Sequence, residues 1–270
     1  MRTLCFELLA LALAPALWAV SIAQEQVRAE EPRKRVELPG IVIDLENRLV
    51  DVEGTIRVTD GPLELVACTK DSKEHESIVA VAARPMHIHT ALLLLGATNG
   101  NPAMRRAVDE AKTRWENLPP RGDTVEVSLV VTSDEGKPVE RAIGDFILPT
   151  EGRVDEVDGE VLVAPETHKD DAGKPPKKFT HTFVFAGSLL VENGQGPRRY
   201  LADESGDVVS IATFGDEVLS LPFHQSQAND SLSWRANPKT LPPAGTKVTL
   251  RLRPQNKNKR PTKDSAKDPK

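Results

Sequence analysis

Apolar residues in this chain occur mostly in short runs, each of strand length and each bounded by turn residues. Between Val125 and Val131, every second residue is Val or Leu, and the residues between them are mostly polar. This period of two is typical of a β-strand with one buried face. Similar runs at 41–43, 49–52 and 63–68 are separated by turn signals such as Gly61-Pro62. The pattern therefore favours a fold built mainly from short strands.

Further strands are expected along the rest of the chain. Residues 55–58 extend the second run, and residues 75–81 return after a turn to form a hairpin with 63–68. We predict about ten strands in all, mostly antiparallel, the later ones at 139–148, 179–185, 189–191, 200–201, 208–213 and 248–252. His181 alternates with phenylalanines at 179, 183 and 185, so we expect it in the core.

Two helices are predicted near the N-terminal third. Residues 86–95 have Pro85 before them and Gly96 after them, which favours a helix, although four consecutive leucines would also suit a buried strand. A second helix is expected over 102–115, with Asn101 as its N-cap and apolar residues at helical spacing. Strands and helices together predict a single β-rich α+β domain over residues 36–253.

The N-terminus has the features of a secretory signal peptide. Arg2 precedes an apolar run from Leu8 to Val20, and Ser21-Ile22-Ala23 is a small-x-small cleavage site. We expect residues 1–23 to be removed near Ala23, leaving a charged, flexible leader over 24–35. The alternative is an uncleaved membrane anchor, but the run is short for a span, and no other stretch is long and apolar enough to cross a membrane. The expected location is therefore secreted or periplasmic.

Cleavage leaves Cys68 as the only cysteine, so the mature chain has no internal disulfide. One cysteine cannot hold an iron–sulfur cluster, and none is predicted. Leu65, Val66 and Ala67 place the thiol in an apolar run, which favours burial. Pairing with another chain and a reactive thiol are the alternatives.

Two charged segments interrupt the apolar pattern. Residues 165–178 read as a flexible insertion within the domain, or as a linker between two domains. Residues 254–270 form a basic tail rich in Lys, Arg and Pro, which we expect to be disordered. The tail could contact an anionic surface, or could simply be a solvated terminus. Aromatic residues make up only 4% of the chain, too few for a nucleic-acid surface, so no nucleic-acid partner is predicted.

The segment Lys73-Glu74-His75-Glu76-Ser77 is one candidate site. In a strand, Glu74 and Glu76 would share one face, and His75 and Ser77 the other. A histidine beside carboxylates could act as a general base, or could bind a metal ion together with Glu76. The alternative is a polar hairpin end that faces water.

His87 and His89 are the other candidate site residues. On a helix, a spacing of two residues sets side chains about 200° apart, so His87 and His89 cannot both face one ion. One of them could join His75 where the hairpin meets the helix start. The predicted metal ligands are His75, Glu76 and His87, with a divalent metal ion as the one cofactor considered. Alternatively, each histidine satisfies nearby backbone groups at the helix start.

Several of these segments resemble one family. KEHESI, followed by ARPMHIHTALLLLGATNGNP, is similar to the hallmark of the YdjY-type domain of secreted bacterial proteins. Three weaker pieces fit the same pattern: GDTVEVSLVV, FVFAGSLLVENGQGPRRYLADESGDVVSIATF and GTKVTLRLRP. The resemblance covers about Val36 to Pro254 and implies a secreted or periplasmic domain of unknown function. Some relatives are described as ferredoxin-like, but this chain lacks the cysteines for a cluster, and the family offers no catalytic residues to carry over.

The chain also lacks the sequence motifs of several enzyme classes. It has no GxSxG nucleophile elbow, no GxGxxG fingerprint and no phosphate-binding loop. We therefore expect a non-enzymatic module that binds a ligand, an extracellular partner or an envelope component. The alternative is a metal-binding or acid/base site at the KEHES segment and the MHIH helix start.

Overall fold

The computed structural model describes residues 34–133, 135–150, 179–228 and 232–255. Residues from Lys34 onward group as one unit. The predicted signal peptide, the 165–178 insertion and most of the leader and tail lie outside the described residues. At the boundaries of the described part, the first strand begins at Arg35 and the last ends at Gln255.

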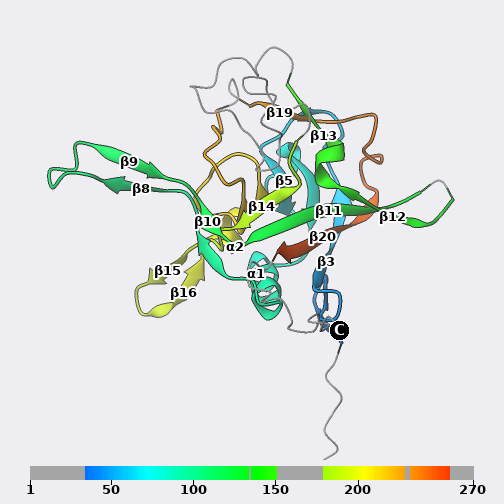
Figure 1. The fold of residues 1–270 in the computed structure, drawn as a ribbon, viewed down its shortest axis with the longest axis horizontal. Helices are drawn as coiled ribbons and strands as arrows, with labels where there is room; N and C mark the ends of the chain where they lie inside the picture. Colours follow the sequence, from blue (N-terminus) through cyan, green and yellow to red (C-terminus); the bar gives the residue numbers. More distant parts are fainter. Residues whose placement is uncertain (1–33, 134, 151–178, 229–231, 256–270) are drawn as a thin grey trace, which may run out of the picture. The chain divides into compact units, whose positions relative to one another are not determined.

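Eight strands close into a mixed barrel, which Figure 1 shows around the centre of the domain. Neighbouring strands are antiparallel except for β17 with β18 and β5 with β6, which run parallel. The circuit closes where β6 pairs with β3. In barrel order the strands are β3 (Leu49–Ile56), β20 (Lys247–Gln255), β11 (Thr124–Thr132), β14 (Thr182–Phe185), β18 (Leu219–Ser220), β17 (Asp207–Ser210), β5 (Leu65–Thr69) and β6 (Ser77–Val81).

Shorter elements are added around this barrel. β2 (Ile41–Asp44) and β1 (Arg35–Leu38) extend the sheet beyond β3, and β12 (Pro138–Ala142) pairs with the end of β11. The helices of the described part are α1 (Pro85–Leu94) and α2 (Leu201–Ser205), with 3-10 turns at Glu74–Glu76 and Ile143–Phe146. The small sheets contain β4 (Gly61–Pro62), β13 (Ile147–Pro149) and β19 (Trp234–Ala236); β7 (Asn99–Asn101) and β10 (Arg121–Gly122); β8 (Met104–Ala107) and β9 (Trp115–Leu118); and β15 (Leu190–Asn193) and β16 (Gly196–Tyr200).

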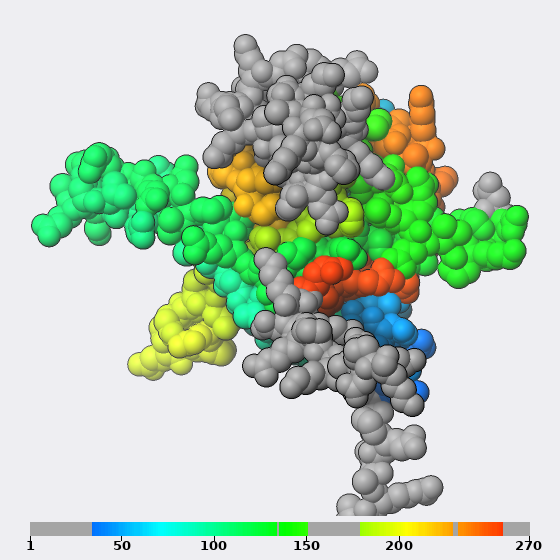
Figure 2. Space-filling view, viewed as in Figure 1, coloured from blue at the N-terminus to red at the C-terminus, as the bar shows by residue number. Residues whose placement is uncertain are grey.

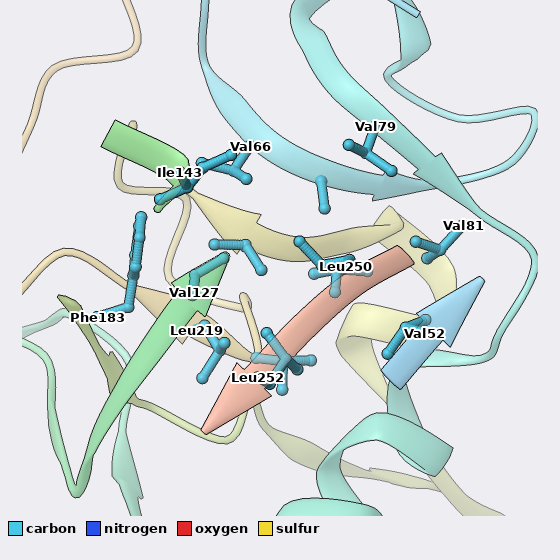
Figure 3. Packing of buried hydrophobic residues seen from close by; sticks show 14 of the residues in the cluster. Val52, Val66, Val79, Val81, Val127, Ile143, Phe183, Leu219, Leu250 and Leu252 are labelled. Atoms are coloured by element: carbon cyan, nitrogen blue, oxygen red, sulfur yellow. The ribbon is translucent and has the colours of Figure 1, made fainter. Parts of the chain in front are cut away.

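The predicted β-rich domain is therefore confirmed, with strand alternation supplying its core. In β20, Val248, Leu250 and Leu252 are buried, while the residues between them are polar and partly exposed. In β11, Val125, Val127 and Leu129 are buried in the same way. Figure 3 shows three of them, Val127, Leu250 and Leu252, packed inside the barrel with labelled residues of β3, β5, β6, β14 and β18.

The barrel closes tightly at Gly54 of β3. A Cβ at this position would lie 2.4 Å from Cγ1 of Val79 on β6, closer than real Cβ atoms approach other atoms. Gly54 pairs with Val81 in the short β3–β6 ladder, which spans only three residue pairs. The absence of a side chain at Gly54 thus permits the pairing that completes the barrel.

The helix predicted over 86–95 is confirmed. α1 begins with Pro85 at its first turn, and Gly96 at φ +77° follows its end. Ile88, Ala91 and Leu92 are buried against the core, whereas Leu93 and Leu94 are exposed. No helix in the described ranges is long and apolar enough to cross a membrane.

The helix predicted over 102–115 is wrong. Its residues form β8, an exposed loop and β9, a hairpin that projects from the barrel (Figure 2). Asp109 stabilises the loop by accepting N–H bonds from Thr113 and Arg114. Helical spacing stabilises a helix only when its apolar face packs against a core. Here Met104, Val108 and Trp115 are exposed, so there is no core against which a helix would pack.

Two other expectations also need correction. The 63–68 and 75–81 segments do not form a hairpin, because β5 and β6 are parallel and the strand begins only at Ser77. His181 is exposed and not in the core, because β14 starts at Thr182, one residue after it.

We expect Leu250→Ala to lower the free energy of unfolding by about 2–5 kcal/mol, because it removes a fully buried side chain and leaves a cavity in the barrel. Leu190→Ala is the matched control, since Leu190 is 55% exposed and should change stability by less than about 0.5 kcal/mol. Urea denaturation measures both. Equal losses in the two variants would contradict the assigned core.

Candidate functional site

The chain passes from β5 to β6 through Lys70–Glu76, which we call the return turn. Because β5 and β6 are parallel, this turn leads the chain back along the strands to the other end of the pair. Local hydrogen bonds stabilise it: Ser72 Oγ donates to the Thr69 carbonyl at 2.6 Å, and Ser77 Oγ donates to the Lys73 carbonyl at 2.8 Å. Glu74 Oε1 accepts the N–H of Asp71 at 2.9 Å.

The predicted site residues of the KEHES segment have different environments. The Glu74 carboxylate pairs with Arg57 of the neighbouring chain segment after β3, with Nε to Oε2 at 3.0 Å. The His75 side chain is 79% exposed, and its Nε2 lies 3.6 Å from Oε2 of Glu76. Ser77 is buried at the start of β6. His75 therefore fits the alternative interpretation, a polar turn end that faces water. Glu74 forms an ion pair with Arg57.

No local sequence pattern predicts the most buried polar contact of the turn. Lys73 Nζ lies 2.8 Å from both carboxylate oxygens of Asp207 on β17, and also 3.5 Å from the ring centre of Phe214. Asp207 is fully buried. Burial raises the pKa of Asp207 to about 7; Lys73 opposes this rise and the charge of Asp216 adds to it. These partners are 134 residues apart in sequence, and no local pattern links them.

Cys68 is buried on β5, as predicted. Its strand position is opposite Asp207 of β17. Burial raises the pKa of the Cys68 thiol, which disfavours the thiolate that a nucleophile would need.

The helix histidines are directed to another part of the fold. His89 Nδ1 lies 3.1 Å from the Gly187 carbonyl and 2.9 Å from the Tyr200 hydroxyl, and burial lowers its pKa. The start of α1 is held by Asp203 of α2, which accepts the N–H of Met86 at 2.9 Å and pairs with Arg84. His87 is partly buried, and its Nδ1 has no hydrogen-bond partner among the described residues.

The predicted ligands His75, Glu76 and His87 do not form one group. β6 separates the KEHES segment from the helix start, and its four residue steps cover about 13 Å at about 3.3 Å each. Within the described residues, no three His, Cys, Asp or Glu side chains lie close enough to hold one metal ion. The described residues therefore do not form the predicted metal site between the return turn and the start of α1.

A cavity of about 920 Å³ lies on the outer side of β3, β6, β20 and the end of β11; we call it the outer groove. Its charged lining residues are Arg57, Lys70, Lys247 and Glu53. Lys247 Nζ donates to Thr55 Oγ1 at 3.3 Å. The remaining lining residues are small, aliphatic or hydroxyl-bearing: Gly54, Thr55, Ala80, Ala82, Val130, Val131, Thr132, Pro138, Gly245, Val248 and Thr249.

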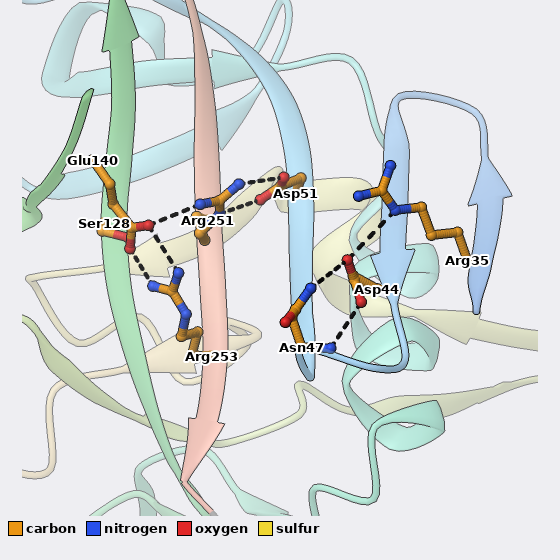
Figure 4. A network of polar contacts seen from close by, with 8 residues as sticks. All are labelled: Arg35, Asp44, Asn47, Asp51, Ser128, Glu140, Arg251 and Arg253. Carbon is orange, nitrogen blue, oxygen red and sulfur yellow. Dashed lines mark hydrogen bonds and ion pairs between the residues drawn. The ribbon is translucent and has the colours of Figure 1, made fainter. Parts of the chain in front are cut away.

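A ladder of charges lies further along the same strands (Figure 4). Arg251 of β20 makes a two-point contact with Asp51 of β3, at 2.6 and 2.7 Å, and reaches Glu140 of β12 at 2.8 Å. Arg253 also pairs with Glu140, and these bonds lower the pKa of Glu140 to about 2. A smaller cavity of about 600 Å³ adjoins the ladder, but its arginines have carboxylate partners, so the ladder links strands rather than leaving charges for a ligand.

The outer groove has a partial signal in the sequence. β20 alternates Lys247, Thr249, Arg251 and Arg253 with buried apolar residues, and β3 alternates Glu53 and Thr55 in the same way. Alternation places these polar residues together on the outer face of the barrel. The sequence does not indicate which strands are neighbours, so it could not indicate the groove.

The YdjY domain matches residues 41–253, so the chain belongs to the YdjY domain family. No curated protein and no solved structure gives a significant match to the chain.

We expect Asp207 to make stability depend on pH. Between about pH 4 and pH 7 the folded chain keeps a proton on Asp207 that the unfolded chain has released, so its contribution to stability falls as the pH rises through this window. The slope from one such group is at most about 1.4 kcal/mol per pH unit. Asp207→Asn should flatten the slope in urea denaturation series.

The control for this prediction is Asp60→Asn, which changes a carboxylate that is 60% exposed and pairs with Arg235. This control should leave the slope between pH 4 and pH 7 as in the unsubstituted protein. An unchanged slope in Asp207→Asn would contradict the assignment.

Proposed function

We propose that this YdjY-domain protein is a secreted or periplasmic, non-enzymatic module that binds an anionic ligand in the outer groove. The observation that carries the proposal is the lining of that cavity, in which three cations, Arg57, Lys70 and Lys247, accompany one carboxylate, Glu53. An excess of one charge sign in a concave site attracts ligands of the opposite sign.

The contacts of each cation in the groove are consistent with anion binding. Lys70 is 62% exposed, and within the described residues its ion-pair partner is Asp71, at 4.0 Å. Exposed ion pairs of this kind contribute little to the stability of the fold, so the Lys70 ammonium remains available to a ligand. Lys247 has a hydroxyl as its hydrogen-bond partner. Arg57 is held in place by Glu74, which fixes its position at the edge of the groove.

The remaining lining suits an extended ligand held by side chains. Thr55, Thr132 and Thr249 supply hydroxyl groups, and Ala80 and Ala82 contribute only small side chains to the lining. The barrel strands under the groove already pair with their neighbours, so their backbone groups do not offer a free edge. Recognition would therefore depend on the cations and hydroxyl groups and would be electrostatic in character.

The placement of the acid/base candidates favours binding over catalysis. His75, Glu76, His87 and Asp207 line neither the outer groove nor the smaller cavity. A general base must reach the proton it removes, directly or through one water. Neither of these two cavities would therefore supply a substrate to the acid/base alternative.

The same proposal extends to the partner. Residues 256–270 contain six Lys or Arg and two Asp, so the basic tail would add attraction to the same anionic partner. We therefore propose an anionic component of the envelope or of the extracellular surroundings as the partner.

We expect a variant with both Lys70→Glu and Lys247→Glu to bind anions about tenfold more weakly than the unsubstituted protein. Loss of two contacts of about 0.5–1 kcal/mol each accounts for that change. Fluorescence anisotropy with labelled hexaglutamate, polyphosphate and heparin fragments measures it, and higher salt should weaken binding of the unsubstituted protein.

The matched control is Lys239→Glu, which reverses an exposed lysine that lines neither cavity. It should keep the affinity of the unsubstituted protein. If none of the three probes binds saturably, or if Lys239→Glu weakens binding as much as the double variant, the outer groove is not the anion site.

A further inference from the structure

A buried ion pair, in addition to the Glu74–Arg57 pair, anchors the return turn to the barrel. Asp207 of β17 is fully buried, and Lys73 is 26% exposed, so the pair lies at the inner side of the turn. Lys73 Nζ touches both carboxylate oxygens and also faces the Phe214 ring. Its ammonium can reach water by rotating outward, whereas the Asp207 carboxylate cannot.

The surroundings of Asp207 contain more negative than positive charge. Cys68 is opposite it on β5, and Asp216 approaches from the segment between β17 and β18. Among the described residues, Oδ1 of Asp216 and Oε1 of its neighbour Glu217 are buried without a hydrogen-bond partner. The charge of Lys73 also acts on Glu64, whose other charged neighbours are Glu76 and His75. Lys73 is thus the cation that compensates Asp207.

The return turn also forms part of the outer groove. Its first residue, Lys70, lines the groove, and its Glu74 holds Arg57, which lines it as well. Two of the three cations proposed to bind the ligand therefore depend on where the turn lies. The turn is tied to the barrel at Lys73, between these two positions.

We infer that Asp207 acts as a proton-operated latch: when its carboxylate takes up one proton from solvent, Lys73 loses its counter-ion and the return turn opens, which weakens anion binding in the outer groove. The consequence for binding rests on the proposed function; the opening of the turn does not. The ammonium of Lys73 keeps its protons throughout, so the step consists of one proton gained by Asp207.

The conditions for the latch follow from burial. Asp207 takes up its proton near pH 7, because burial favours the neutral carboxyl group. A neutral Asp207 makes the barrel more stable, while it removes the charge that attracts Lys73. Acidification therefore has opposite effects on the barrel and on the turn, which distinguishes a latch from general loosening of the fold.

Hydrogen exchange of the full chain, read by mass spectrometry and corrected for intrinsic exchange rates, tests the opening. The protection of amides 71–76 should fall about fivefold or more between about pH 8 and about pH 6 in the unsubstituted protein. Asp207→Asn imitates the neutral carboxyl group, so its turn should be weakly protected at both pH values. Asp60→Asn should behave like the unsubstituted protein.

A second variant covers the case in which Asp207→Asn does not fold. Lys73→Gln removes the ammonium and keeps a polar side chain, and its turn should also be weakly protected at both pH values. Equal protection at pH 8 and pH 6 in the unsubstituted protein would overturn the latch. A fall that persists unchanged in Asp207→Asn, or in Lys73→Gln, would also overturn it, because another group would then be titrating.

The binding arm uses the probe that binds best among hexaglutamate, polyphosphate and heparin fragments. Affinity for the groove should fall in parallel with turn protection, and Asp207→Asn should bind about equally at both pH values. If the probe binds but its affinity does not follow the turn, regulation of the groove is overturned while the proposed function stands. If no probe binds, the proposed function fails, and hydrogen exchange alone decides whether the turn opens.

Discussion

The closure of the barrel at the β3–β6 pairing is the constraint on which the rest of the structure depends. β3 uses one edge for β20 and divides the other between β2 and β6. Only its last residues pair with β6, and they approach closely because Gly54 has no side chain. Without this pairing, β6 and β3 would both have unpaired edges, which natural sheets avoid.

Closure in turn determines the shape of the candidate site. β3 and β5 run in opposite directions, so β6, which pairs with both, is parallel to one of them. That strand is β5, and the chain has only the return turn in which to go back. Parallel strands are usually joined by longer connections, often a helix. A connection this short is restricted to a path close to β5 and β17, which brings Lys73 to Asp207 and Lys70 to the groove.

Local signals predicted much of the fold, and long-range partners account for what they missed. Pro85 and Gly96 bound α1, and the alternating residues of β11 and β20 gave their buried faces. The parallel pairing of β5 and β6 depends on closure of the barrel, which no short segment of the sequence can predict. The same holds for Lys73. The hypothesis for the KEHES motif rested on His75, which faces solvent. The buried partner of the motif is on a strand far away in the sequence.

The described residues include two tryptophans in distinct settings, one of them on the projecting hairpin. Trp115 of β9 is 49% exposed, whereas Trp234 of β19 is 6% exposed and packs edge-to-face against Phe179 at 4.7 Å between ring centres. Indole emission depends on the polarity around the ring, so the two tryptophans should emit at different wavelengths. The tryptophan fluorescence of the described residues therefore combines a signal from the projecting hairpin with a signal from the small sheet that contains β19.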